Sequence, residues 1–168
     1  MSEDRATEIL KNAILLEKRG QAFYSKVAAQ ASGEAVKKFF TLMAEEEVNH
    51  VKILSEQFKS YRTSKKFKPG AYSDAGDEFK TASDILTGDL KQQISAADYE
   101  AAAIAAAMAM EKNAIEIYSR RAAEAPDPDE KALYGWLAKW EAAHLNFLAK
   151  LDRELTEEIW NDNRFWPF

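Results

Sequence analysis

The sequence predicts an all-α protein, a four-helix bundle made of two helical hairpins that are joined by a long crossover. Three observations predict it. Alanine, glutamate and lysine are abundant while the 168 residues include only 6 glycines and 4 prolines, which favours helix over a many-stranded sheet. Four segments repeat apolar residues at intervals of three and four. The two halves of the chain also resemble each other, and the length suits one domain over residues 1–168.

The first hairpin is predicted over about residues 6–61. Its first helix carries Leu10, Ile14, Tyr24 and Val27 at helical spacing and ends near Ser32 and the following glycine. Its second helix has a single apolar seam in which two members are polar. The seam consists of Val36, Phe40, Met43, Glu47, His50 and Leu54.

A crossover over residues 62–94 follows, polar in its first part and with one short helix near 81–90. The second hairpin is predicted over residues 95–158, with Ser95 and Asp98 as capping partners of its first helix. Asp127 is expected to cap its second helix, with Pro128 in the first turn. The aromatic tail, residues 159–168, either packs on its own bundle or offers a contact surface for a partner.

The second hairpin repeats the first. Leu15–Tyr24 aligns with Ala109–Tyr118, and the same offset of 94 residues relates Glu47 to Glu141. Glu17 and Glu47 lie at nearly equal distances from the first turn, so a rise of about 1.5 Å per residue brings them to nearly the same height. The second hairpin behaves in the same way, which predicts one site shared by four helices.

Composition excludes several classes of function. A net charge of −5 and a pI near 5.2 provide no basic stripe for a nucleic-acid partner. No apolar stretch is long enough to cross a membrane, and the first residues lack the apolar core of a secretory signal, so we expect a cytoplasmic protein without a membrane partner. The chain has no cysteine, so any redox centre must use oxygen and nitrogen ligands.

The polar members of the seams have the properties of a metal site. Residues three apart share a helix face, so each Glu-x-x-His pair can bind one centre jointly. Buried carboxylates are costly unless compensated, and two divalent cations would balance four of them. This donor set suits iron or manganese, with zinc as a possible substitute, and we expect two iron ions. The expected ligands are Glu17, Glu47, His50, Glu111, Glu141 and His144. Glu45 and Glu46 are expected on the solvated face.

One glutamate on the first and third helices and Glu-x-x-His on the second and fourth resembles ferritin-like diiron-carboxylate proteins. The phrases MAEEEVNH and LEKRGQAFY and the long link are similar to the rubrerythrin branch. The resemblance implies that Glu47 and Glu141 bridge the irons, with the other four residues as terminal ligands. Tyr24 and Tyr118 occupy matching positions, either as hydrogen-bond donors to a ligand carboxylate of the other hairpin or as ordinary buried tyrosines.

The chain departs from that pattern in two ways. Rubrerythrins proper carry a cysteine-ligated rubredoxin domain, for which this sequence has no cysteines. Electrons are therefore expected from a separate donor protein such as a rubredoxin, or from ferrous iron itself. Ala114 stands where rubrerythrins have an extra glutamate one turn after Glu111, which argues against the usual family route of peroxide reduction.

The leading functional prediction is a diiron oxidoreductase that reduces hydrogen peroxide or dioxygen. One alternative is a ferroxidase that oxidises and passes on iron, because the six-ligand set without an extra glutamate resembles ferritin sites. Another is a bundle in which the metal only stabilises the core or serves a binding partner. The resemblance also implies a homodimer.

Overall fold

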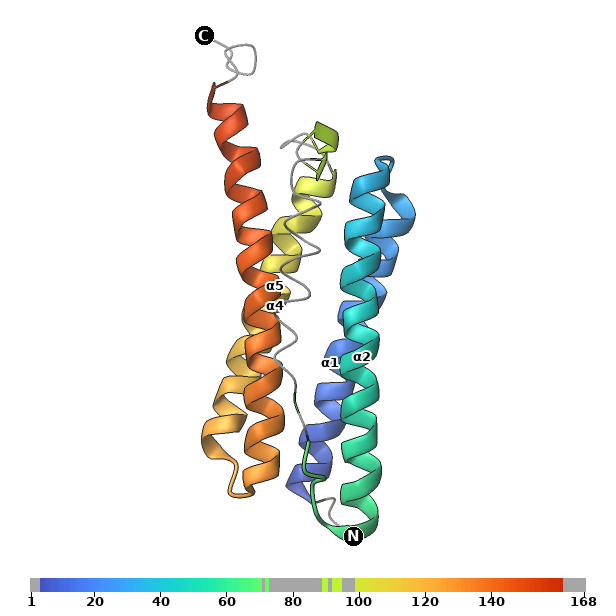
Figure 1. Ribbon diagram of the computed structural model, residues 1–168, viewed down its shortest axis with the longest axis vertical. Helices are drawn as coiled ribbons and strands as arrows, with labels where there is room; N and C mark the ends of the chain where they lie inside the picture. The colour runs from blue at the N-terminus through green and yellow to red at the C-terminus, as the bar shows by residue number, and fades with distance from the viewer. Residues whose placement is uncertain (1–3, 71, 73–88, 91, 95–98, 162–168) are drawn as a thin grey trace.

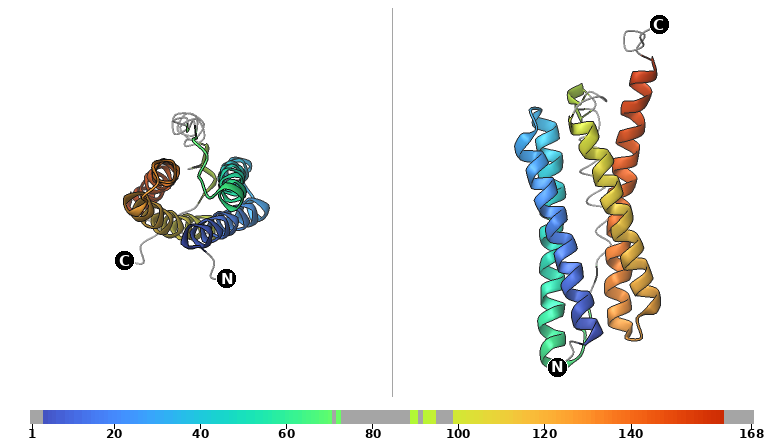
Figure 2. Two further views of the ribbon diagram at one scale, coloured as in Figure 1. Left: turned by 90° about the horizontal axis from the view of Figure 1, so that it is seen from below. Right: turned by 180° about the vertical axis from the view of Figure 1, so that it is seen from behind.

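The computed structural model describes residues 4–70, 72, 89–90, 92–94 and 99–161. Four long helices make up most of this part, and the predicted four-helix bundle is confirmed. Helices α1 (Arg5–Gln30) and α2 (Glu34–Ser64) form one antiparallel hairpin, and α4 (Tyr99–Glu124) and α5 (Pro128–Asn161) form the other (Figure 1). The hairpins lie side by side with α1 next to α4 (Figure 2).

The helix ends follow from local chemistry. The carboxylate of Asp4 accepts a hydrogen bond from the backbone N–H of Ala6 at the start of α1. Asp127 caps α5 as predicted, accepting from the backbone N–H groups of Asp129 at 2.8 Å and Glu130 at 3.2 Å. Helix α2 continues past the expected end near residue 61 to Ser64, because no breaker intervenes before Lys65 adopts the left-handed conformation.

Several expected features fall wholly or partly outside the described residues. The proposed caps Ser95 and Asp98 lie there, as does most of the expected short helix over residues 81–90, of which Asp89 and Leu90 are helical. Helix α5 extends beyond the expected residue 158 to Asn161, and the rest of the aromatic tail, residues 162–168, is not described.

The apolar core is divided into two clusters. One lies toward the α1–α2 turn and includes Tyr24, Phe40, Met43 and Leu148, all fully buried. The second, which includes Leu10, Leu54, Leu133 and Leu137, lies toward the opposite end. Between them along the helices lies a layer of buried glutamates and histidines, so the polar residues are enclosed by apolar packing above and below.

The beginning of the crossover joins α2 to α5. The side chain of Gln57 donates to the carbonyl of Lys68 at 3.0 Å and accepts from its N–H at 2.9 Å. Phe67 is buried in the second apolar cluster, and the ring of Tyr72 stacks on Trp136 of α5. The segment is therefore fixed to both hairpins.

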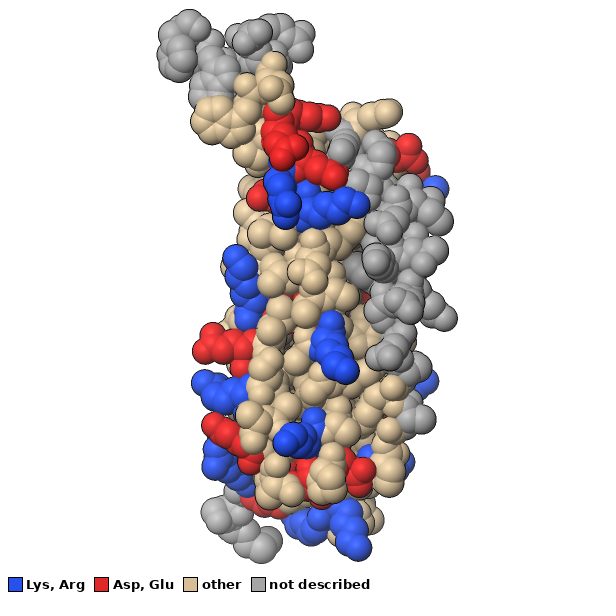
Figure 3. All heavy atoms as spheres, turned by 60° about the vertical axis from the view of Figure 1, so that its left-hand side comes forward, with Lys and Arg blue, Asp and Glu red and all other residues tan. Residues whose placement is uncertain are grey.

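The charged side chains are mixed in sign. On the face shown in Figure 3, basic and acidic side chains are interspersed and do not form a basic stripe. Among the described residues, no helix combines the length and the apolar character needed to span a membrane.

Candidate metal centre

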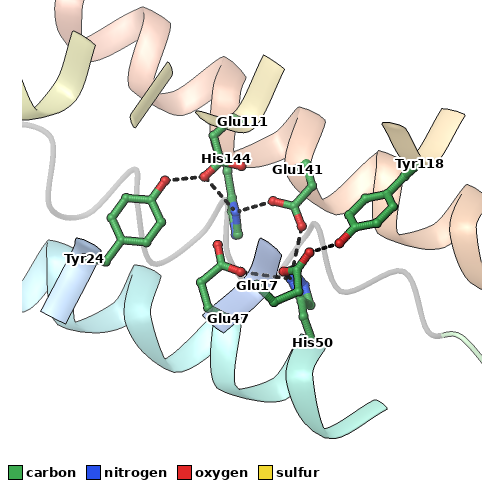
Figure 4. A network of polar contacts seen from close by, with 8 residues as sticks. All are labelled: Glu17, Tyr24, Glu47, His50, Glu111, Tyr118, Glu141 and His144. Carbon is green, nitrogen blue, oxygen red and sulfur yellow. Dashed lines mark hydrogen bonds and ion pairs between the residues drawn. The ribbon is translucent and has the colours of Figure 1, made fainter. Parts of the chain in front are cut away.

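The structure brings the six predicted ligand residues together in the polar layer (Figure 4). Helices α1 and α4 contribute one glutamate each, and α2 and α5 contribute one Glu-x-x-His pair each. All six are at most 3% exposed. The residues are Glu17, Glu47, His50, Glu111, Glu141 and His144. Glu45, by contrast, is exposed and Glu46 is partly buried, and neither belongs to the cluster.

The cluster contains two groups of four potential ligands that share two members. Glu17 and His50 belong to one group, Glu111 and His144 to the other, and both groups contain Glu47 and Glu141. Within each group, one possible ligand atom per residue can be chosen so that all lie within 4.8 Å of one another. The two shared carboxylates are therefore placed so that both groups can use them.

Distances within the cluster are short. Nδ1 of His50 lies 3.0 Å from Oε2 of Glu17 and 3.1 Å from Oε1 of Glu141. The other oxygen of Glu141 lies 3.2 Å from Nδ1 of His144. The Glu141 carboxylate thus lies between the two imidazole rings. Glu47 is 3.6 Å from His50, and Glu111 is 3.6 Å from His144.

Burial and charge strongly shift the ionisation of these groups. Burial, reinforced by the charge of Glu141, raises the pKa of Glu111 to about 7 and raises the pKa of Glu47 well above its usual range. Burial alone would lower the pKa of His144, but hydrogen bonds with Glu111 and Glu141 outweigh it and raise the pKa to about 10. The metal-free site therefore holds protons on several of its ligands.

The donor set fits metal ions. Four carboxylates and two imidazoles provide oxygen and nitrogen donors of the kind that bind iron, manganese or zinc. Divalent cations would replace the protons and compensate the negative charge that burial otherwise penalises. The buried clusters could therefore hold metal.

Two tyrosines connect the hairpins through the ligand carboxylates. The hydroxyl of Tyr24 on α1 donates to Oε1 of Glu111 on α4, and the hydroxyl of Tyr118 on α4 donates to Oε1 of Glu17 on α1. Burial and then the nearby carboxylates raise the pKa of both phenols well above the usual value, so they remain protonated donors. Each phenol can therefore fix the orientation of a carboxylate in the opposite hairpin.

A small cavity reaches the cluster between α1 and α4, on the carboxylate side. Its lining consists of Leu16, Glu17, Gly20, Tyr24, Glu47, Met110, Glu111, Ala114 and Glu141. The offset of 94 residues relates Leu16 to Met110 and Gly20 to Ala114, so the two hairpins contribute equivalent positions to the cavity wall. Ala114, at the position where the rubrerythrin pattern has an extra glutamate, is buried in the lining and offers no ligand atom.

Gly20 allows the close approach of α1 to the shared carboxylate of α2. A Cβ atom at this position would lie 3.2 Å from Cδ and 3.3 Å from Oε1 of Glu47. The spacing of the ligands does not indicate Gly20. Its signal in the sequence is a glycine inside a helix, three residues after Glu17, where the repeat has Ala114.

The histidine side of the cluster is closed by two tryptophans of α5. The ring of Trp140 lies edge-on to both His50 and His144, and Trp136 lies against His50. The predicted seam does not include these tryptophans, because it runs through Leu137 and Glu141, whereas Trp140 and Trp136 precede His144 by four and eight residues.

Comparison with known proteins agrees with this arrangement. No curated protein and no solved structure matches the chain. The family model described as Rubrerythrin matches residues 8–152, a range that contains all six clustered residues and both tyrosines. Since this match covers most of the 168 residues, the chain belongs to the rubrerythrin family.

Proposed function

We propose that this chain is a non-haem diiron oxidoreductase that reduces hydrogen peroxide or dioxygen. The observation that carries the proposal is the pair of buried ligand groups that share Glu47 and Glu141. A purely structural site would need neither two adjacent groups nor a cavity leading to their carboxylates. When bound there, a pair of iron ions would supply the electrons for reduction of the oxidant.

The protein's own residues would hold the metals and control access to them. Glu17 with His50, and Glu111 with His144, are the proposed terminal ligands, while the two shared glutamates are the proposed bridges. Tyr24 and Tyr118 keep the terminal carboxylates oriented by donating a hydrogen bond to each. The ligand carboxylates themselves line the cavity between α1 and α4, so an oxidant bound there would lie beside the metals.

We further propose that a separate protein, such as a rubredoxin, supplies the electrons, and that the chain acts as a homodimer. The sequence given contains no cysteine, so the bundle itself has no ligands for a rubredoxin-type centre that could supply these electrons.

Rapid mixing tests the proposed reaction. The protein is loaded with Fe(II) without oxygen and then mixed with hydrogen peroxide or dioxygen in parallel. Oxidation of the bound iron, with consumption of one oxidant faster than by free Fe(II), supports the proposal. Bound iron that reacts with neither oxidant faster than free Fe(II) contradicts it and favours a metal that only stabilises the bundle.

A ferroxidase is the second candidate, and Ala114 is the observation that favours it. Among the described residues that line the cavity, Ala114 lies one turn after Glu111 and offers no seventh carboxylate as an alternative ligand. The fate of the iron separates the two functions. An oxidoreductase keeps about two iron ions per chain through repeated cycles, whereas a ferroxidase releases oxidised iron and takes up more Fe(II).

A further inference from the structure

Three aromatic rings connect the histidines of the site to the outer part of the bundle. Trp140 is only 7% exposed, and its ring centroid lies 5.6 Å from that of His50 and 5.9 Å from that of His144. Trp136, one turn earlier on α5, lies 5.9 Å from Trp140 and 5.6 Å from His50. Tyr72 stacks on Trp136 with the centroids 5.4 Å apart and the planes 28° apart. Every step in this series is shorter than 6 Å.

The outer end of the series is held in place. Gln57 of α2 donates a hydrogen bond from Nε2 to the hydroxyl of Tyr72 at 3.1 Å, and the same side chain pairs with the backbone of Lys68. Tyr72 and Trp136 are partly buried, in contrast to the almost enclosed Trp140. The rings therefore lead from the ligands toward solvent.

The repeat shows that the bundle does not require tryptophan at these positions. The offset of 94 residues relates Trp136 to Leu42 and Trp140 to Glu46 of the first hairpin. Neither counterpart is aromatic, although the ligands themselves are duplicated. The two tryptophans thus make the second hairpin different on the histidine side of the site.

The aromatic series and the cavity lie on different sides of the cluster. The cavity is lined by four of the glutamates and by no histidine or tryptophan. Trp140, in contrast, contacts both histidines. An oxidant in the cavity and an electron arriving through the rings would therefore approach the metals separately.

Resting on the proposed function, we infer that Tyr72, Trp136 and Trp140 form a relay that passes single electrons inward to the oxidised metal site. Indole and phenol rings can lose one electron and regain it. They are not readily reduced, so the relay operates only when the oxidant needs more electrons than the two irons supply. Reduction of dioxygen to water takes four electrons, and two of these would come through the rings.

Each transfer balances in electrons and protons. The metal site would gain one electron from Trp140, which regains it from Trp136, or directly from Trp136. Trp136 regains an electron from Tyr72, whose phenol releases its proton to water. A one-electron reductant at the surface, with a proton from water, restores Tyr72. The net change is one electron moved from the reductant to the site, and no ring is consumed.

The surroundings of Trp140 favour rapid return of its electron. Its indole N–H is buried and has no hydrogen-bond acceptor among the residues that the structure describes. Without a base to take the proton, an oxidised Trp140 remains a radical cation, which is a strong oxidant of the neighbouring Trp136.

The test uses the full chain loaded with Fe(II) and mixed with dioxygen in the absence of a reductant, because the irons supply only two of the four electrons that dioxygen takes. Freeze-quenched samples are examined by electron paramagnetic resonance, and oxidised residues are located by peptide mass spectrometry. We expect a transient organic radical, narrowed by ring-deuterated tryptophan or tyrosine, and oxidation products at the three relay residues. The variants are Trp140→Phe, Trp136→Phe and Tyr72→Phe, each with its iron content measured.

Matched controls lie away from the relay. Trp160→Phe alters an indole that is 65% exposed on the same helix, and Tyr99→Phe alters a phenol that is 50% exposed. Both controls should retain the radical and the pattern of products. Trp136→Phe should lose oxidation of Tyr72 and accumulate it on Trp140, and Tyr72→Phe should accumulate oxidation on the two tryptophans. If Trp140→Phe binds iron poorly, these two outer variants still decide the matter.

The outcomes separate the relay from the proposed function. Oxidant consumption with products distributed equally over Trp160 and Trp140, and unchanged by the relay substitutions, overturns the relay alone. Iron-loaded protein that consumes neither peroxide nor dioxygen overturns the proposed function and the relay with it. A radical that moves with the substitutions supports both.

Discussion

Replacing Glu47 with glutamine tests the proposed site most directly. Glu47 is 3% exposed, belongs to both ligand groups and lies on the same face of α2 as His50. Glu47→Gln preserves the shape of the side chain and removes the negative charge that both metals would share. Because burial raises the pKa of this carboxyl well above its usual range, the substitution resembles its protonated form, and the metal-free protein should remain folded.

The expected effect is a loss of the stabilisation that metal provides. A metal present at about a thousand times its Kd stabilises the folded chain by about 4 kcal/mol. For a chain of this size that corresponds to a rise in Tm of about 8–16 °C. Loss of a partner that only supports a ligand weakens binding about 10–100-fold, and loss of the ligand itself should cost at least as much. If binding becomes about 100-fold weaker, the same metal concentration is only about ten times Kd. The stabilisation by metal is then about 1.4 kcal/mol, and the rise in Tm falls to about 3–6 °C.

The assay is calorimetry with and without anaerobic Fe(II), together with elemental analysis of the bound iron. Glu45→Gln is the matched control, because this glutamate is two residues away on α2 and exposed. The control should keep the full metal-dependent rise. Equal behaviour of Glu47→Gln and the unmodified protein would refute the site, and an equal loss in the control would show that the metal lies on another face of α2.

Three further predictions follow from neighbouring features. Gly20→Ala should raise or preserve the metal-free Tm through a gain in helix propensity of about 1 kcal/mol, yet reduce the metal-dependent rise, because its Cβ would come 3.2 Å from the shared α2 carboxylate. Gly135→Ala, which meets nothing within 4 Å, should raise Tm without that loss, and identical behaviour of the two variants would contradict the argument. Arg121→Met should lower the free energy of unfolding by about 3–5 kcal/mol in urea titrations, because Glu130, 2% exposed, loses its buried ion-pair partner; a loss near zero would show that the pair contributes little. Metal binding at pH 7 should release protons to an indicator dye. The pKa of Glu111 is raised to about 7 and that of His144 to about 10, so both groups carry protons in the metal-free site. Apparent metal affinity should accordingly rise with pH, and binding without proton release would contradict this view of the free site.

The features that sequence predicts well here depend on local chemistry. Helical periodicity places Glu141 and His144 on one face of α5. The side chain of Asp127 caps the same helix by accepting hydrogen bonds from the backbone N–H groups two and three residues further along the chain. The fold class follows from the same periodicity, repeated in four segments. The similar heights of Glu17 and Glu47 follow from helical rise and one short turn.

The features that sequence does not predict depend on contacts between distant segments. The closeness of Gly20 to Glu47 is set by how α1 packs on α2, which periodicity leaves open. The stacking of Tyr72 on Trp136 depends on where the crossover lies, and a polar segment without periodicity gives no sign of that. That the cluster binds iron stays a prediction, since clustering establishes only that metal could be held.

The contact of Gln93 with the start of α2 has a consequence for local unfolding. Its side-chain oxygen accepts from the backbone N–H of Ala35 at 2.9 Å, across a separation of 58 residues. Helix α2 begins at Glu34, and the N-cap residue before it, Gly33, has no side chain to cap it; a Cβ there would come 2.4 Å from that same oxygen. The first turn of α2 is therefore capped by the far end of the crossover. Amide hydrogen exchange at Ala35 should consequently report whether the crossover is docked, and protection there should be lost in Gln93→Ala while amides in the middle of α2 remain protected.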